Sequence, residues 1–186
     1  MLQKFICILM IFGFLSCPLN VFSQNAEKTV EPIEVVESRV GFYGGTRGAL
    51  IASTSDSFVR AFSITYTGNM VWGSAGINLI SPKDISKFKS IVIRAKGTKG
   101  AKFVLNFRSQ EWRLYDVVQS GTKALPSKGL TPEFQDIVID IQKDIMDRAG
   151  KLDPTSIIQL AFEVGKASTD NKSGVEVIID GVFFVK

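Results

Sequence analysis

The chain ends with Gly174-Val-Glu-Val-Ile-Ile-Asp-Gly-Val-Phe-Phe-Val-Lys186. This stretch predicts one long β-strand with Asp180 at its centre. An unpaired strand this apolar promotes aggregation, so we expect it to be built into a sheet. The last residues therefore predict a sheet that is closed by the C-terminal segment.

Strand patterns also fill most of the preceding chain. In 102–109, for example, Phe103, Leu105 and Phe107 share one face and Val104, Asn106 and Arg108 share the other, as in a half-buried strand. The predicted strands begin near residues 33–37 and continue as Arg47–Ser53, Phe58–Thr67, Val71–Ile80, Ser90–Lys96, Lys102–Ser109, Glu111–Val118, Phe134–Ile141, Ser156–Val164 and Val175–Val185. The fold class that this predicts is all-β, an antiparallel two-sheet β-sandwich.

Few other elements interrupt the strands. The glycine-dense segment 41–48 predicts a turn region, because glycine adopts positive φ without strain. Residues 81–88 and 142–149 each predict a short helical turn, too short to cover a parallel sheet. The sequon Asn171-Lys-Ser173 is interpreted as a turn.

The first residues predict export. Residues 1–23 combine a basic start at Lys4 with an apolar run to Leu15, which is typical of a signal peptide and predicts export from the cytoplasm of a bacterium, to the periplasm, to the cell surface or into the medium. Cleavage after Ser23 is the preferred interpretation. The alternative is lipidation of Cys17, and the protein would then be held at a membrane. We expect a flexible leader over 24–32 and one β-sandwich domain over 33–186.

Composition limits the possible chemistry. The net charge of +4 falls to +3 without residues 1–23, and no basic run suggests a nucleic-acid partner. Both cysteines, Cys7 and Cys17, lie in the signal region, so no disulfide is expected in the domain. The absence of histidine excludes catalytic triads of the Ser-His-Asp type and zinc sites built from histidine.

The order of the segments resembles that of known families. Strand 58–66 is followed by Trp72-Gly73, then by Pro82–Gly97, by Glu133–Asp140 and by Val177–Asp180. This order resembles galactose-binding-domain-like jelly rolls, in particular the family-eleven carbohydrate-binding modules and the complex I intermediate-associated protein family. The first resemblance implies a glycan, such as a polysaccharide, held on one open sheet face.

The ligand candidates are aromatic rings, which stack on sugar C–H faces, and outward polar side chains, which bind hydroxyls. A solvated sheet face, or a buried core tryptophan, is the alternative interpretation of these residues. The candidates are Trp72, Arg94, Asn106, Arg108, Trp112, Tyr115, Gln159 and Glu163. Tyr66 is a further ring of interest.

The resemblance also implies a structural calcium. Asp180 matches the last-strand aspartate of related jelly rolls, and Glu37 is the nearest acidic counterpart near the first strand. Oxygen ligands of this kind suit calcium. A bulge aspartate before Gly181 is the alternative interpretation.

The sequence therefore predicts an exported, non-catalytic glycan-binding module. A structural or assembly partner protein without a sugar ligand is the alternative. An enzyme, either a jelly-roll lyase or a glycosidase with two carboxylates, is disfavoured, because no carboxylate pair stands out.

Overall fold

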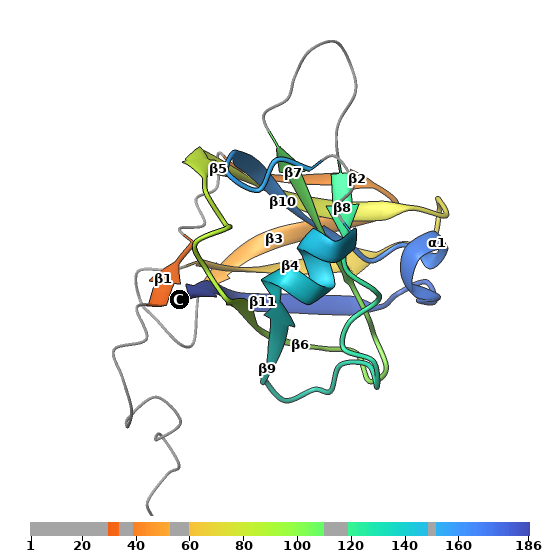
Figure 1. Ribbon diagram of the computed structural model, residues 1–186. Helices are drawn as coiled ribbons and strands as arrows, with labels where there is room; N and C mark the ends of the chain where they lie inside the picture. Colours follow the sequence, from red (N-terminus) through yellow and green to blue (C-terminus); the bar gives the residue numbers. More distant parts are fainter. Residues whose placement is uncertain (1–29, 34–38, 53–59, 110–118, 149–151) are drawn as a thin grey trace, which may run out of the picture.

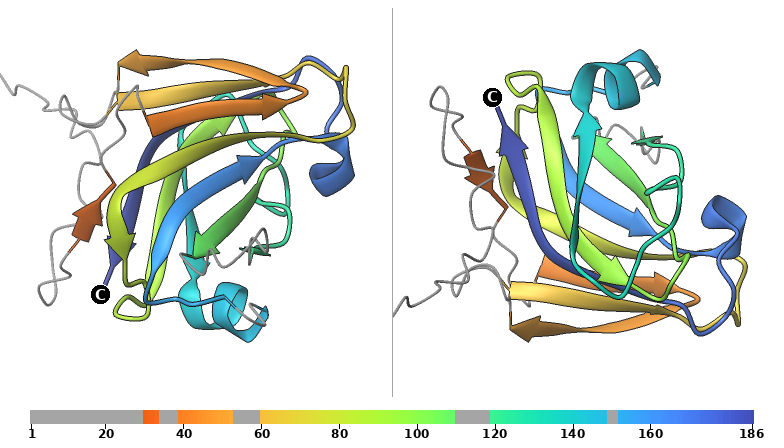
Figure 2. Two further views of the ribbon diagram at one scale, coloured as in Figure 1. Left: turned by 90° about the horizontal axis from the view of Figure 1, so that it is seen from above. Right: turned by 90° about the horizontal axis from the view of Figure 1, so that it is seen from below.

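The computed structural model describes residues 30–33, 39–52, 60–109, 119–148 and 152–186. Eleven strands form two antiparallel sheets, which face each other as the two layers of a sandwich (Figures 1 and 2). This confirms the predicted all-β sandwich. Among the described residues, no helix is both long and apolar enough to cross a membrane.

Sheet A has the strand order β3-β4-β11-β6-β9, and β1 pairs with β11 outside this path. Its central strand is the predicted C-terminal one, which pairs with β4, β6 and β1. The strands are β1 (Val30–Pro32), β3 (Thr46–Ala52), β4 (Arg60–Tyr66), β6 (Ser90–Gly97), β9 (Gln135–Asp140) and β11 (Glu176–Val185).

Sheet B has the strand order β2-β5-β10-β7-β8. Its strands are β2 (Val40–Gly44), β5 (Gly73–Lys83), β7 (Val104–Ser109), β8 (Gln119–Gly121) and β10 (Ile157–Glu163). The short helical elements are η2 (Ile141–Ile145), η3 (Met146–Arg148) and α1 (Lys166–Thr169), and α1 lies apart from the other two in both views of Figure 2.

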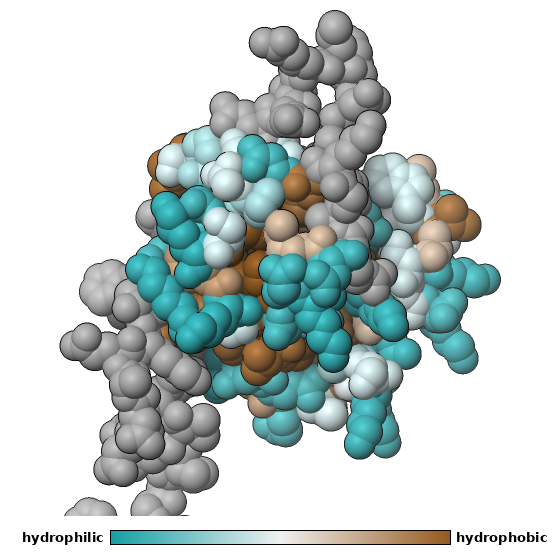
Figure 3. Space-filling view, viewed as in Figure 1, coloured by the Kyte–Doolittle hydropathy of each residue, from teal (hydrophilic) through white to brown (hydrophobic). Residues whose placement is uncertain are grey.

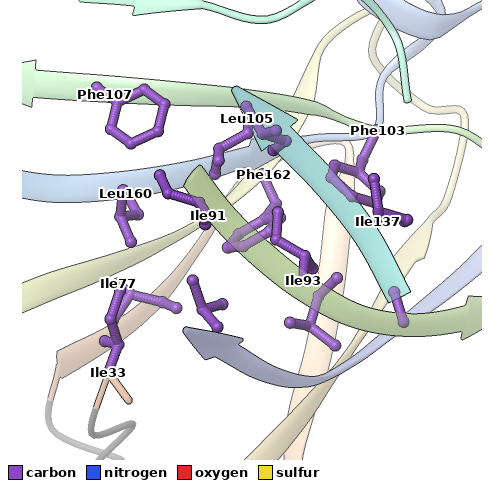
Figure 4. Close-up of a cluster of buried hydrophobic side chains, with 14 of the residues drawn as sticks. Ile33, Ile77, Ile91, Ile93, Phe103, Leu105, Phe107, Ile137, Leu160 and Phe162 are labelled. Atoms are coloured by element: carbon purple, nitrogen blue, oxygen red, sulfur yellow. The ribbon is translucent and has the colours of Figure 1, made fainter. Parts of the chain in front are cut away.

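The core lies between the two sheets. Phe162 of β10 is fully buried and makes edge contacts with Phe62 of β4 and with Phe103, which directly precedes β7, at ring-centroid distances of 5.5 and 5.6 Å. Figure 4 shows aliphatic side chains from both sheets, such as Ile93 and Leu160, converging around these rings. Burial of this apolar surface is the dominant stabilising contribution in a chain with no disulfide in the described domain.

The alternation predicted for two strands assigns their inner and outer sides correctly in β7 and, except at one residue, in β10. In β7, Phe107 is buried in the core while Arg108 faces outward, as predicted. In β10 the prediction is wrong at one residue, because a register shift between Ile157 and Gln159 buries Ile157 instead of Ile158. A β-bulge of this kind adds a residue and changes the parity of the strand.

The glycine-dense segment 41–48 is not a turn region, contrary to the prediction. It contains most of β2 and the first three residues of β3, with Gly45 between the two strands. Gly44, at the connection between the strands, has positive φ, whereas Gly48 serves close approach. A Cβ at Gly48 would collide with the carbonyl oxygen of Ser63 and the ring of Phe42, so no larger residue fits there.

Two further predictions need correction. The expected leader ends in β1, which pairs with β11 beside the C-terminus (Figure 1). The expected helical turn at 81–88 is the end of β5 followed by a turn in which the Asp84 carboxylate accepts hydrogen bonds from Ser86. The strand β8 and the helix α1 were not predicted. The predicted strand 111–118 lies outside the described residues.

The helical turn predicted at 142–149 is confirmed through residue 148. The sequon residue Asn171 lies in the turn between α1 and β11, as predicted. Its side-chain amide makes three hydrogen bonds to the backbone. It accepts from the Lys102 backbone N–H at 3.0 Å and donates to the carbonyls of Lys102 and Val164 at 2.6 and 2.9 Å. Asn171 therefore ties the α1 turn to the start of β7.

Candidate functional site

The outer face of sheet B carries three rows of side chains that run across the strands. Residues paired across a sheet point to the same side, so the register defines each row. The rows are Tyr43-Ser74-Glu163-Val104, then Gly41-Gly76-Ala161-Asn106-Gly121, then Asn78-Gln159-Arg108. We call the middle one the small-residue row.

Because the side chains of the small-residue row are short, longer side chains of the adjacent rows pack flat against the sheet. The ring of Tyr43 lies over Gly41, with its Cζ and Cε2 atoms 2.6 and 2.9 Å from where a Cβ at that position would be. The same ring lies 3.4 Å from the corresponding point at Gly76, and the amide of Gln159 lies 3.1 Å from it. Tyr43 remains 45% exposed. The result is an aromatic ring supported by the sheet and open to solvent.

The corner that carries Tyr43 is fixed by hydrogen bonds. The Thr46 hydroxyl donates to the carbonyl of Tyr43 at 2.7 Å and lies 2.9 Å from the carbonyl of Ser74. These bonds join the ends of β2 and β5, so the backbone under the ring is tied to two strands. A supported ring loses little conformational freedom when a ligand binds to it.

Some polar groups of this face have hydrogen-bond partners among the described residues, and others do not. Gln159 donates to the Asn78 amide oxygen at 2.6 Å, and the Glu163 carboxylate accepts from the Ser168 hydroxyl at 2.7 Å. The Nδ2 atom of Asn106 and the Nε atom of Arg108 are buried and have no hydrogen-bond partner among the described residues. A buried donor without an acceptor costs about 1–3 kcal/mol. This part of the face therefore has unused donors.

The structure brings together four of the predicted ligand residues. Asn106, Arg108, Gln159 and Glu163 lie within the three rows on the neighbouring strands β7 and β10. Asn106 and Gln159 are mostly buried, at 4% and 9% exposed. Arg108 and Glu163 are half-buried.

Trp72 is exposed beside this face. It directly precedes β5, and its ring packs against Gly44, with Cε3 2.6 Å from where a Cβ would lie. With Met70 and Val71 it forms a small exposed hydrophobic group in the β4–β5 connection. Hydrophobic side chains project next to α1 at the right-hand edge of Figure 3.

The remaining aromatic candidates are not on this face or are not described. Tyr66 is buried, and its hydroxyl donates to the Met70 carbonyl at 2.7 Å, so it is a core residue. Trp112 and Tyr115 lie outside the described residues. Of the predicted rings, Trp72 is thus the one that the structure shows to be exposed.

Arg94 is separated from the other candidates. It faces outward, as predicted, but from sheet A, where it lies opposite Asp136 and the bulge at Gly181. Its Nε atom is 3.5 Å from the Asp180 carboxylate, and its guanidinium lies over the Phe134 ring at 5.3 Å. Arg94 is therefore placed in a charged cluster on the opposite side of the sandwich.

Asp180, which was predicted to bind calcium, belongs to the same charged cluster as Arg94. Asp180 is 1% exposed and lies at a register shift of β11, so it is a bulge aspartate beside the positive charge of Arg94. Glu37 lies outside the described residues, and the described part of the chain holds no group of three acidic or other metal-binding side chains. Calcium needs six to eight oxygen ligands, and its binding here remains a prediction.

Tyr43 is the main residue of the face that sequence reasoning missed. Val40-Gly-Phe-Tyr43 alternates as a strand, with Val40 and Phe42 packed against the core, and this alternation was the available signal. The glycines on either side concealed it, because glycine disfavours strands in isolation.

The fold belongs to the jelly-roll class of β-sandwiches. The structure is similar to that of a family 30 carbohydrate-binding module, with a TM-score of 0.63 and 17% identity over 84% of this chain and 95% of the module. It is also similar to a family 11 module of a cellulosomal cellulase of Clostridium thermocellum, with a TM-score of 0.61 and 15% identity over 87% of this chain and 97% of the module.

A third similar structure is a family 11 module in complex with a β-1,3-1,4-mixed-linked tetrasaccharide, with a TM-score of 0.56 and 16% identity over 83% of this chain and 94% of the module. At these identities the similarity establishes the fold, and it confirms the predicted jelly-roll resemblance. No protein-family model and no curated protein matches the sequence. The resemblance to the complex I intermediate-associated family remains a prediction.

Proposed function

We propose that this chain is a non-catalytic glycan-binding module that holds a polysaccharide across the outer face of sheet B. The observation that carries the proposal is the Tyr43 ring, which lies on the sheet at one side of a row of polar groups. Sugar rings stack their C–H faces on aromatic rings, and their hydroxyls pair with amide and guanidinium groups. Both kinds of group are present on this face.

The spacing of these groups suits an extended ligand. Tyr43 is on β2, whereas Asn106 and Arg108 are on β7, three strands away. Adjacent strands lie about 4.8 Å apart, so the ring and the donors are separated by about 14 Å. A chain of several sugar rings can reach both, and a single monosaccharide cannot.

The fold supports the same proposal. Structures of family 11 and family 30 carbohydrate-binding modules share it, and one of them holds a tetrasaccharide. The three rows contain one carboxylate, Glu163, whereas glycosidases generally use two. Binding without hydrolysis is therefore the activity that we propose.

Isothermal titration of the domain with soluble polysaccharides tests the proposal. The panel contains mixed-linkage β-glucan, agarose oligosaccharides and polygalacturonate, and reducing-sugar release is measured in parallel. We expect binding to at least one glycan, no released sugar, and loss of binding in Tyr43→Ala. Val138→Ala, an exposed apolar residue on sheet A, is the control. A folded domain that binds none of these glycans contradicts the proposal.

We further propose that the protein is exported. The support is the pattern of residues 1–23, with Lys4 followed by an apolar run, which lies outside the described residues. Mass spectrometry of the mature protein from a bacterial host tests this. An N-terminus at Gln24 supports cleavage after Ser23, a lipidated Cys17 supports membrane anchoring, and an intact N-terminus contradicts export.

A further inference from the structure

We infer that the glycan bound by this face is acidic, with a carboxylate or sulfate group seated at Asn106 and Arg108 of β7. This inference rests on the proposed function, because it names the class of ligand for the same site. It starts from the unequal state of the polar groups across the three rows.

Most polar groups of the rows already have partners within the protein. The amides of Gln159 and Asn78 bind each other, and Glu163 binds the Ser168 hydroxyl. Asn106 is 4% exposed, yet within the described part of the chain its Nδ2 atom has no acceptor, and the buried Nε atom of Arg108 has none either. The donors of Asn106 and Arg108 on β7 therefore lack acceptor oxygens among the described residues.

Position and charge specify the kind of acceptor. Asn106 and Arg108 are two residues apart on one strand, so both side chains point to the same side and lie about 7 Å apart along it. No described carboxylate lies within ion-pair distance of Arg108. The carboxylate of the rows, Glu163, is four residues along β10 from Gln159, the partner of Arg108, and is therefore about 13 Å away.

An anionic group on the ligand meets both requirements. A carboxylate or sulfate offers only acceptor oxygens, and the guanidinium of arginine binds such groups through two parallel hydrogen bonds. A neutral hydroxyl can satisfy one donor but leaves the positive charge of Arg108 without a counter-charge. The face therefore favours an acidic sugar unit three strands away from the Tyr43 ring.

Matched pairs of polysaccharides test the inference with the unmodified domain. The first pair is polygalacturonate and its methyl-esterified form, and the second is a sulfated galactan and its desulfated form. We expect the acidic member of at least one pair to bind about tenfold more tightly or better, the effect of one charge-assisted hydrogen-bond pair. The pair that shows the preference distinguishes carboxylate from sulfate. The preference is expected to fall as NaCl rises from 50 to 500 mM.

A variant pair assigns the preference to the site. Arg108→Gln is expected to bring the acidic-to-neutral affinity ratio close to one. Arg47→Gln removes the same charge from the exposed edge of sheet A and should leave the ratio unchanged. Equal binding of acidic and neutral glycans, or a preference that survives Arg108→Gln, overturns the inference while the proposed function stands. Binding of no glycan at all overturns both.

Discussion

Moving the Tyr43 ring without removing it separates the position of the ring from its chemistry. In Gly41→Ala the new methyl group would lie 2.6 Å from Cζ of Tyr43, whereas carbon atoms in contact are about 3.5 Å apart or more. The ring must therefore move by about 1 Å or swing away from the sheet. The backbone at Gly41 does not have positive φ, so alanine fits the strand, and we expect a change in unfolding free energy within about 0.5 kcal/mol.

The magnitude follows from the exposed area of the ring. Tyr43 is 45% exposed, and a tyrosine of about 200 Å² thus offers about 90 Å² to a ligand. At about 25 cal/mol per Å², full coverage by a sugar contributes about 2 kcal/mol, which corresponds to about 30-fold in affinity. We expect Gly41→Ala to lose a large part of this and Tyr43→Ala to lose all of it. Tyr43→Phe should keep most of it.

A double-mutant cycle supplies the control. In the Tyr43→Ala background the methyl group at residue 41 has no ring to displace, so Gly41→Ala should have no further effect on the dissociation constant measured by titration calorimetry. If Gly41→Ala weakens binding equally with and without Tyr43, the platform reasoning is refuted. Unchanged affinity in Tyr43→Ala refutes it as well.

Three further predictions concern stability. Phe162→Ala should lower the free energy of unfolding by about 3–5 kcal/mol in a denaturant titration, because it leaves a cavity between the sheets. Val138→Ala, at an exposed residue, should change it by less than about 0.5 kcal/mol. Equal losses in the two variants would contradict the placement of Phe162 in the core. Asn171→Ala should cost about 2 kcal/mol or more, because it removes the three hydrogen bonds that this buried side chain makes with the backbone of Lys102 and Val164, and a melting temperature equal to that of the wild type would argue against the tie to β7. The hydrogen bond from Lys83 lowers the pKa of the Glu31 carboxyl, so this group stabilises the fold at neutral pH and loses that effect as the pH falls below about 4.3. Glu31→Gln should therefore melt below the wild type at pH 7 and together with it at pH 3, and a pH-independent difference would contradict the assignment.

The strands of the core were predictable because burial imposes a period of two. Phe103, Leu105 and Phe107 identified the inner side of β7 and placed Asn106 and Arg108 outward, as the structure confirms. The same reasoning placed Gln159 and Glu163 outward. It failed at Ile158, because a bulge changes the parity of a strand and leaves no clear mark in the residue types.

The composition of the site was less predictable. Alternation distinguishes inward from outward residues but does not assign a strand to one of two sheets, since that depends on pairing between distant segments. Arg94 was therefore grouped with Arg108, although the two lie on opposite faces of the sandwich. Tyr43 was missed for a different reason. Its role depends on Gly41 and on Gly76, which is far away in the sequence, and the pairing of these glycines becomes visible only in the sheet.

Mapping a bound oligosaccharide onto the two faces of the sandwich tests the central claim most directly. The backbone amides are followed by NMR while a β-1,3-1,4-glucan tetrasaccharide or an oligogalacturonate, whichever binds more tightly, is added to the domain. We expect the largest shift changes at Tyr43, Asn106 and Arg108 and in the strands between them, β5 and β10. Changes confined to the outer face of sheet A, around Arg94 and Val138, would contradict the claim that sheet B holds the glycan.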